Sequence, residues 1–275
     1  MKFYKDKVIV ITGAGSGIGR ALAKKLSSYG ASVAINDKNA ETLAETLAMI
    51  DSGERKNSQF AADISVPEEV DLFAKHVIAE HGKVDVLINN AGVALGRMKT
   101  EEISLEQWDW IMRVNFGGHL LCTNAFLPYL KKQKEGYIAN LSSIFGSAVL
   151  KERAGYCASK SAINGMTEAM RQEFKNTNVH ISLVIPGGIR TNLTNNSEGW
   201  KDKNMQNRAA KMQSEDSLTS AEDGADVILN GIRKRKYRIL IGKDAKVLDW
   251  LSRFTPTYYG RVLNFFVSRA ERKQS

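Results

Sequence analysis

Short apolar runs alternate along the chain with longer amphipathic stretches, and this alternation predicts repeated β-α-β units. Several of the runs are continuously apolar, as expected for parallel strands that are covered on both faces of a sheet. The runs predict seven strands, over residues 7–13, 31–37, 58–64, 84–92, 136–143, 180–188 and 238–242. The amphipathic stretches predict helices over residues 18–29, 39–50, 67–81, 105–132, 154–176 and 221–235.

No linker, repeat or low-complexity segment divides this pattern. We therefore predict a single α/β domain over residues 1–243, a doubly wound parallel sheet with helices on both faces. A polar stretch over residues 192–220 interrupts the alternation and predicts a lid over the strand ends. Residues 244–275 then form a basic C-terminal extension.

Composition narrows the class of protein. The chain has 275 residues, of which 43% are hydrophobic and 25% charged, as is typical of globular proteins. No apolar run approaches the roughly 18 residues of a membrane-spanning helix, and no signal-peptide pattern is present, so we expect a cytoplasmic protein. The two cysteines, Cys122 and Cys157, and the four histidines lack ligand spacing, so we expect neither a disulfide framework nor a metal site.

The net charge of +9 lies near the C-terminus. From residue 231 onward there are 12 Lys and Arg against 3 Asp and Glu, and of the totals of 39 and 30 this leaves 27 of each sign in the rest of the chain. A body with balanced charge has no electrostatic reason to bind nucleic acid, so we expect no nucleic-acid partner.

The stretch "TGAGSGIGR" follows the first predicted strand and opens the first predicted helix. This context is typical of a dinucleotide-binding loop, in which Gly13 makes the tight turn, Gly17 lets the backbone approach a pyrophosphate and Gly19 permits close helix packing. The anion would lie at the helix N-terminus, where free N–H groups and the helix dipole favour negative charge. The structural alternative is a flexible surface loop.

Asp37 ends the second predicted strand, 18 residues after Gly19. A carboxylate at this position can accept both hydroxyls of an adenosine ribose and would repel a 2′-phosphate. Lys38 follows and could offset that repulsion. The sequence therefore favours NAD(H), with NADP(H) as the alternative, while "NDKN" is also ordinary turn chemistry.

Tyr156 and Lys160 are four residues apart in "GYCASK" and share one face of a predicted helix. A tyrosine acts as an acid or base near neutral pH only if its pKa falls by about 2–3 units from about 10. A neighbouring ammonium group in a partly dry site supplies an effect of that size. The pair alone is weak, because the same spacing is common on exposed helix faces.

Six motifs in order resemble the short-chain dehydrogenase/reductase family: "TGAGSGIG", "NNAG" at 89–92, "VN" at 114–115, "LSS" at 141–143, "YCASK" at 156–160 and "PGGIRT" at 186–191. The resemblance covers about residues 5–242. It implies a Rossmann fold whose seven-stranded sheet has the strand order 3-2-1-4-5-6-7.

The resemblance also implies four catalytic residues. Tyr156 would be the general acid/base, and Lys160 would lower the pKa of the tyrosine and bind the nicotinamide ribose. Ser143 would hold the substrate oxygen, although the adjacent Ser142 is a competing candidate. Asn115 would complete a proton relay through water to Lys160, or its amide would satisfy backbone groups in a kinked helix.

Further positions resemble the family's cofactor bed. The end of the third strand would contact adenine, the "NNAG" segment the ribose, and the "PGGIRT" segment the nicotinamide carboxamide. The cofactor-binding residues implied in this way are Gly13, Ser16, Gly17, Ile18, Gly19, Asp37, Asp63, Ile64, Asn90, Gly92, Tyr156, Lys160, Pro186, Ile189 and Thr191.

The extension lies outside the resemblance and is predicted to be helical and amphipathic. Its apolar residues group at helical spacing, in two sets: Val247, Leu248, Trp250, Leu251 and Phe254, then Tyr259, Val262, Leu263 and Phe266. Such a stripe packs on the body or on a second subunit, or it lies on an anionic membrane surface. Packing is the more frequent outcome for an amphipathic stripe, whereas the basic charge of this extension favours the membrane.

Together these features predict an NAD(P)-dependent oxidoreductase acting on an alcohol or carbonyl. One rival is a non-catalytic nucleotide-binding protein, which would be expected to have lost Tyr156 or Lys160. The other is a Rossmann methyltransferase, which would leave Asn115, Ser143, Tyr156 and Lys160 without a task. The family commonly forms homodimers or homotetramers through helices equivalent to residues 105–132 and 154–176. Apolar residues that could lie under the lid, together with the extension, predict a lipophilic substrate, although each residue could equally belong to the core: Phe145, Val149, Leu150, Ile189, Leu193, Trp200, Met205 and Met212.

Overall fold

A computed structural model describes residues 1–50, 55–191, 197–198, 203, 207, 218–261 and 263. Its centre is a seven-stranded parallel sheet of order β3-β2-β1-β4-β5-β6-β7, which confirms the predicted topology. The central strands are buried along their whole length because helices cover both faces. The strands are β1 (Val8–Thr12), β2 (Ser32–Asp37), β3 (Ser58–Ala61), β4 (Val86–Asn89), β5 (Gly136–Leu141), β6 (Val179–Pro186) and β7 (Arg238–Ile241).

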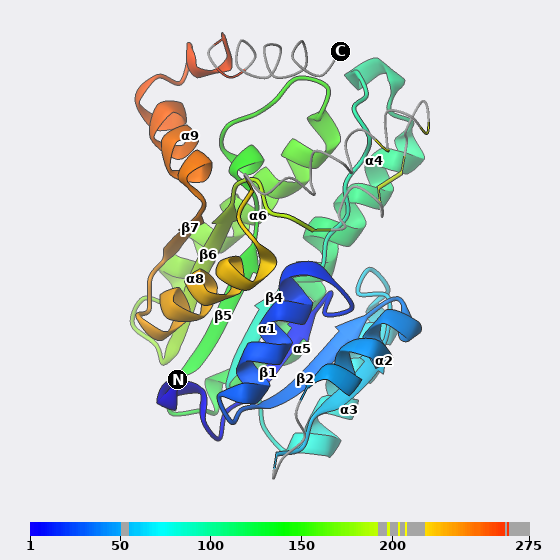
Figure 1. Cartoon of the computed structure of the whole chain (residues 1–275), viewed down its shortest axis with the longest axis vertical. Helices are drawn as coiled ribbons and strands as arrows, with labels where there is room; N and C mark the ends of the chain where they lie inside the picture. The colour runs from blue at the N-terminus through cyan, green and yellow to red at the C-terminus, as the bar shows by residue number, and fades with distance from the viewer. Residues whose placement is uncertain are drawn as a thin grey trace.

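Two apolar cores lie on the two faces of the sheet. One face carries α1 (Gly17–Ser28), α2 (Ala40–Met49) and α8 (Ala221–Arg233). Figure 1 shows α1 and α8 side by side on the face nearest the viewer. The opposite face carries α3 (Pro67–His81), α5 (Gly118–Lys131) and α6 (Ala154–Glu173).

The helix predicted over residues 105–132 is interrupted. It consists of α4 (Leu105–Met112), a π-helical turn, η3 (Arg113–Gly117), and α5. Hydrophobic spacing cannot reveal the interruption, because the π turn widens the backbone hydrogen bonds from i→i+4 to i→i+5 without ending the helix. Single π turns of this kind are frequent at functional sites, and this one contains the buried Asn115.

The C-terminal extension contacts the body of the protein. After β7 the chain forms α9 (Lys243–Phe254), shown in orange at the upper left of Figure 1. Ala245 of this helix is fully buried, and Leu248 and Tyr259 pack on the apolar cluster around η4 (Ile144–Gly146). A boundary at residue 243 stays a prediction, and most of the predicted lid over 192–220 lies outside the described residues. Among the helices of the described ranges, none is both long and apolar enough to cross a bilayer.

The strand order places the ligand crevice. The chain runs outward from β1 to β3 and then returns to pair β4 with the other side of β1, which is a topological switch point. In such sheets ligands bind outside the carboxyl ends of the strands at this point.

Candidate active site

A cavity of about 880 Å³ opens at the carboxyl ends of the strands. All predicted site residues line it except Gly19 and Asn115, which lie immediately behind its wall. Those that line it are Gly13, Ser16, Gly17, Ile18, Asp37, Asp63, Ile64, Asn90, Gly92, Ser143, Tyr156, Lys160, Pro186, Ile189 and Thr191.

The glycine loop joins β1 to α1, and its backbone packs closely against the backbone of neighbouring segments. Gly13 has a φ of +65°, the left-handed turn that glycine adopts without strain. A Cβ on Gly19 would lie 2.2 Å from the carbonyl oxygen of Gly13, so only glycine lets the helix approach the loop this closely. Gly17 lines the cavity at the start of α1, where helix N–H groups favour an anion.

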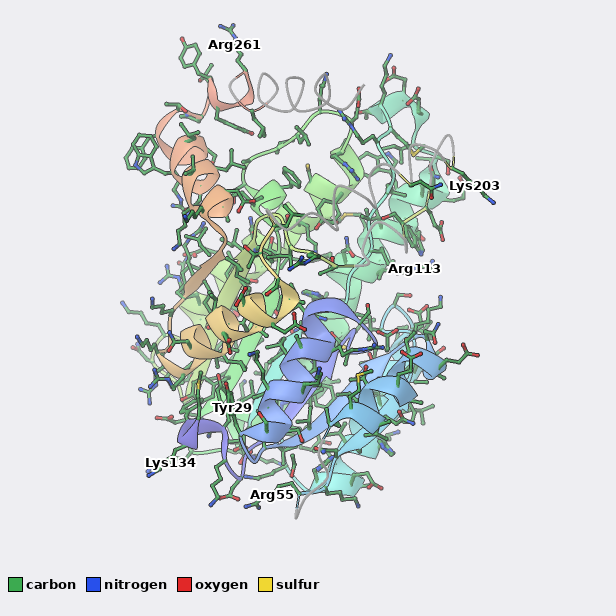
Figure 2. The ribbon with its side chains drawn as sticks, viewed as in Figure 1. Tyr29, Arg55, Arg113, Lys134, Lys203 and Arg261 are labelled. Atoms are coloured by element: carbon green, nitrogen blue, oxygen red, sulfur yellow. The ribbon has the colours of Figure 1, made fainter. Side chains whose placement is uncertain are left out.

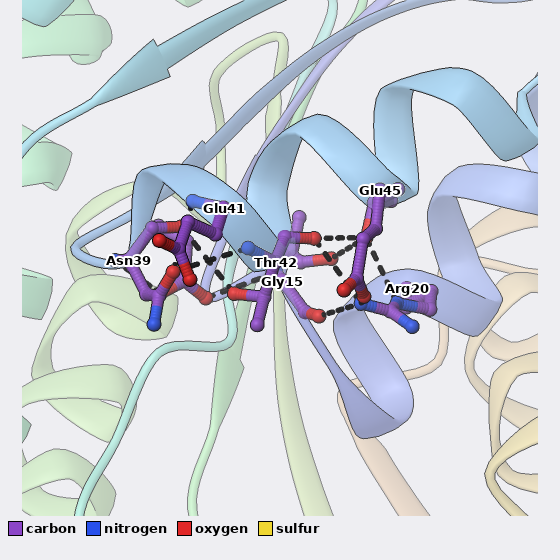
Figure 3. A network of polar contacts seen from close by, with 9 residues as sticks. Gly15, Arg20, Asn39, Glu41, Thr42 and Glu45 are labelled. Atoms are coloured by element: carbon purple, nitrogen blue, oxygen red, sulfur yellow. Dashed lines mark hydrogen bonds and ion pairs between the residues drawn. The ribbon is translucent and has the colours of Figure 1, made fainter.

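Arg20 ties the glycine loop to α2. Its guanidinium donates to the carbonyl oxygens of Gly15 and Thr42, and it forms an ion pair with Glu45 at 2.8 Å. Figure 3 shows this network beside the cap of α2, where the Asn39 side chain accepts from backbone N–H groups. The loop is therefore held in shape by contacts within the chain itself.

Acidic groups line the part of the cavity beyond the glycine loop. The Asp37 carboxylate accepts from the backbone N–H groups of Gly15, at 2.9 Å, and Asn39, at 3.0 Å. The Lys38 ammonium lies 2.9 Å from the Asp63 carboxylate. Burial opposes the charged form of Asp63, but hydrogen bonds from Lys38 and Ser65 outweigh it and lower the pKa of that carboxyl. The Lys38 ammonium is thus paired with the Asp63 carboxylate.

Ser143, Tyr156 and Lys160 meet at the other end of the cavity. Ser143 caps η4, and its hydroxyl accepts from the backbone N–H of Phe145 at 3.2 Å. Tyr156 lies in the first turn of α6 and forms a side-chain hydrogen bond with Ser143. Lys160 follows one turn later, with Nζ 5.8 Å from the centroid of the Tyr156 ring.

The neighbouring Ser142 has a different partner. Its hydroxyl donates to the backbone carbonyl of Lys160 at 3.0 Å and so ties β5 to α6. This geometry favours Ser143 over Ser142 as the hydroxyl available beside Tyr156.

Burial dominates the titration of the tyrosine and the lysine. It raises the pKa of Tyr156, while the hydrogen bond with Ser143 and the positive charge of Arg153 act in the opposite direction. Burial lowers the pKa of Lys160 to about 8, and its Nζ donates to the Leu141 carbonyl at 3.1 Å. A pKa raised above the usual tyrosine value of about 10 keeps the Tyr156 hydroxyl protonated at neutral pH.

Asn115 supports the cavity wall from behind. Its side-chain amide accepts from the Val93 N–H at 2.7 Å and donates to the Val93 carbonyl at 3.0 Å and to the Ser159 hydroxyl at 2.9 Å. These contacts agree with the second of the two predicted roles of Asn115, an amide that forms hydrogen bonds with backbone groups at a kinked helix. The relay to Lys160 stays a prediction.

Several cavity residues were missed at the sequence level. Arg153 lines the cavity three residues before Tyr156, and its guanidinium donates to the Leu95 carbonyl at 2.7 Å. Asp244, at the start of α9, accepts from the Gly188 N–H at 2.6 Å. Leu248 and Leu263 also line the cavity, although their spacing in the sequence indicated only an amphipathic helix. No local motif signals these positions, because their neighbours at the cavity are distant in the chain.

Two of the residues predicted for an apolar substrate pocket line the cavity, while the pocket itself stays a prediction. Phe145 and Ile189 line the cavity, Leu150 is buried elsewhere, and Val149 is 47% exposed. The other predicted members, Leu193, Trp200, Met205 and Met212, lie outside the described residues.

Comparison with known proteins agrees with this geometry. A sequence model of the short chain dehydrogenase family matches residues 7–202. The Mycobacterium tuberculosis protein SadH, named as an oxidoreductase, is 35% identical over 265 residues, which cover 96% of each chain. An uncharacterized oxidoreductase of Staphylococcus epidermidis is 37% identical over 206 residues, or 75% of this chain and 88% of its own.

Solved structures resemble the fold over nearly its whole length. A short-chain dehydrogenase/reductase of Burkholderia phymatum, in complex with NAD, has a TM-score of 0.85 and 27% identity, and the match covers 92% of this chain and 95% of that one. The 3-ketoacyl-(acyl-carrier-protein) reductase of Brucella melitensis, complexed with NADH, has a TM-score of 0.75 and 26% identity, over 86% and 96%. This chain therefore belongs to the short-chain dehydrogenase/reductase family and is an oxidoreductase of that family.

Proposed function

We propose that the protein interconverts an alcohol and its carbonyl compound with NAD(H), and that Tyr156 is the general acid/base. The observation that carries this proposal is the composition of the cavity. One end is lined by the glycine loop and Asp37, and the other by Ser143, Tyr156 and Lys160. A dinucleotide that follows the glycine loop would bring its nicotinamide ring to the tyrosine.

The cofactor, when bound, supplies or accepts the hydride. During reduction the Tyr156 hydroxyl donates its proton to the carbonyl oxygen, and during oxidation it removes the proton from the alcohol. The Ser143 hydroxyl holds that oxygen beside the phenol. Lys160 is already buried here, so its ammonium group stabilises the tyrosinate more strongly than it would in water.

Preference for NAD(H) over NADP(H) follows from the charges around Asp37. The carboxylate would accept the ribose hydroxyls and repel a 2′-phosphate. The ion pair of Lys38 with Asp63 reduces the positive charge that could offset that repulsion. The structural neighbours from Burkholderia phymatum and Brucella melitensis carry NAD and NADH, which supports the same preference.

The substrate we propose is lipophilic. The cavity wall contains a set of apolar side chains: Val93, Ile144, Phe145, Ile189, Leu218, Leu248 and Leu263. Apolar walls of this kind bind a substrate by area and leave its orientation to a few polar groups, here Ser143 and Tyr156.

A titration of the purified protein with NADH and with NADPH, followed by nicotinamide fluorescence, tests the cofactor assignment. We expect NADH to bind at least about tenfold more tightly, and Asp37→Ala to reduce that ratio, since one charge pair of about 1.4 kcal/mol is worth tenfold. If neither nucleotide binds, the proposed function is wrong. A panel of secondary alcohols of rising chain length, assayed with NAD, then tests the substrate class.

A homodimer or homotetramer, a cytoplasmic location and peripheral membrane contact through residues 244–275 stay predictions. The non-catalytic alternative is not favoured, because Ser143, Tyr156 and Lys160 all reach the cavity and the matched relatives are named as oxidoreductases.

A further inference from the structure

The helix α9 has two apolar sides with different surroundings. Its inner side is formed by the buried Ala245 and by Leu248, which lines the cavity. Its outer side carries Val247, Trp250 and Phe254, which are 57%, 57% and 68% exposed. These three residues are spaced by three and four positions, so they form one stripe along the helix.

Aromatic residues extend this outer stripe. The rings of Trp250 and Phe254 lie 5.2 Å apart, and Tyr258, just beyond the helix, is 60% exposed. Contiguous exposed apolar surface of this kind marks an interaction site. Trp and Tyr are the residues that membrane interfaces favour, since one end of each side chain is apolar and the other is polar.

Charges beside the stripe are positive. Lys243, Lys246 and Arg261 are exposed, and Figure 2 shows Arg261 pointing outward at the upper end of the molecule. Each of the two acidic residues of the described segment 243–261 contacts the body of the protein, although Asp244 itself is exposed. Asp249 is buried in ion pairs with Arg238 and Arg253, and Asp244 accepts from the Gly188 N–H.

This charge pattern selects among occupants of the face. A second copy of the chain, related by a twofold axis, would bring the same cationic side chains together, and like charges would oppose the contact. An anionic lipid surface attracts these side chains and accepts the aromatic stripe at its headgroup level.

We propose that the outer face of α9, defined as Val247, Trp250, Phe254 and Tyr258 with Lys243, Lys246 and Arg261, docks on an anionic lipid surface. The opposite side of the same helix lines the cavity, so docking brings the substrate end of the cavity next to the bilayer. Resting on the proposed function, a lipophilic substrate would then reach Tyr156 from the lipid surface.

Co-sedimentation with vesicles tests the docking. The full chain is mixed with vesicles of phosphatidylcholine alone and with vesicles that also contain phosphatidylglycerol. We expect binding at least about tenfold tighter to the anionic vesicles, weakened by added salt. Tryptophan fluorescence should shift to the blue on binding, and the shift should be absent from Trp250→Phe.

Two variants separate the apolar and the charged contributions. Trp250→Ser with Phe254→Ser should weaken binding to anionic vesicles by about tenfold or more, and Lys243→Glu with Lys246→Glu should remove the preference for them. The matched control is Leu105→Ser, because Leu105 is 82% exposed but lies on α4. It should bind as the wild type does.

Equal binding of the wild type and the Trp250→Ser, Phe254→Ser variant would overturn the proposal. So would a wild-type chain that binds neither vesicle, and gel filtration that shows a dimer broken by the same variant would assign the face to a second copy. NADH titration of each variant keeps the two proposals distinguishable, since docking can fail while the cofactor still binds.

Discussion

The two ends of the cavity draw on the chain in different ways. The glycine-loop end includes Thr191, which lies beside Gly17. Most of its residues come from the first third of the sequence: Gly13, Ser16, Gly17, Ile18 and residues 36–39, 62–64 and 90–92. These residues follow β1 to β4, and parallel strands bring their carboxyl ends together. The tyrosine end instead combines η4, the start of α6, the segment after β6 and the C-terminal extension.

The difference has a physical cause. Binding a dinucleotide depends on backbone N–H groups, close approach and one carboxylate, so short motifs are enough to build that end. Surrounding a substrate depends on side-chain volume from whichever segments pack nearby. Short sequence motifs therefore predict the glycine-loop end. The tyrosine end depends on contacts between residues that are distant in the chain, such as Gly188 and Asp244.

Removal of the Tyr156 hydroxyl should separate the two ends most sharply. We expect Tyr156→Phe to lower kcat by about 1000-fold, within the range of a positioned general acid. The dissociation constant of NADH should stay within about threefold, because the glycine-loop end is untouched. Steady-state kinetics and nicotinamide fluorescence measure the two quantities. Activity within tenfold of the wild type would remove Tyr156 from the proposed chemistry.

Gly19→Ala should damage the opposite end. The new Cβ would lie 2.2 Å from the Gly13 carbonyl oxygen, and this backbone atom cannot yield unless the loop moves. We expect NADH affinity to fall by about 100-fold, the loss of about 3 kcal/mol that a buried steric conflict costs. The matched control is Gly165→Ala in α6, where nothing lies within 4 Å of the added Cβ. NADH titration of that variant should match the wild type.

Asp244 tests whether the extension belongs to the working site. Asp244→Leu leaves the Gly188 N–H without its acceptor and should weaken NADH binding by about tenfold, the cost of one lost hydrogen bond to a charged group. Asp244→Asn retains an acceptor oxygen and should stay within about threefold. Fluorescence titration of the two variants decides the matter. An equal loss of NADH affinity in both variants would assign the effect to the charge of Asp244. No loss in either variant would mean that α9 does not contribute to NADH binding.

The smallest expected effect concerns stability at Lys160. The pKa of its side chain falls from 10.5 to about 8 on folding, because burial disfavours the charged form. Between these values the unfolded chain binds more protons than the folded chain, so stability rises with pH through this window. Below about pH 8 the burial of the charge costs its full amount, about 3 kcal/mol.

Lys160→Met should therefore stabilise the protein at pH 7. We expect the free energy of unfolding to rise by about 1–2 kcal/mol. The rise is smaller than the cost of burying the charge, because the hydrogen bond to the Leu141 carbonyl is also lost. The gain should shrink as pH rises from 8 toward 10.5. Urea unfolding at pH 7 and at pH 10 measures both values, and a gain that is independent of pH would contradict the assigned cause.

The pattern of apolar residues predicted the strands of the sheet, but it missed a π turn and the end of β4. Seven apolar runs correspond to the seven strands, because parallel strands buried on both faces leave continuous apolar sequence. The interruption at Arg113–Gly117 was missed, since a π turn keeps helical spacing. The boundary residues Asn90–Gly92, predicted as strand, instead leave β4 and line the cavity.

Sequence alone determined the order of the motifs, and with it which strand ends would meet and which of the predicted residues would lie near the cavity. Only the tertiary structure decided how α9 divides its apolar residues. In the sequence Leu248 and Trp250 belong to one stripe, yet Leu248 lines the cavity and Trp250 is exposed. Helical spacing reports that a face is apolar, while the direction from which neighbouring elements approach decides which residues are covered.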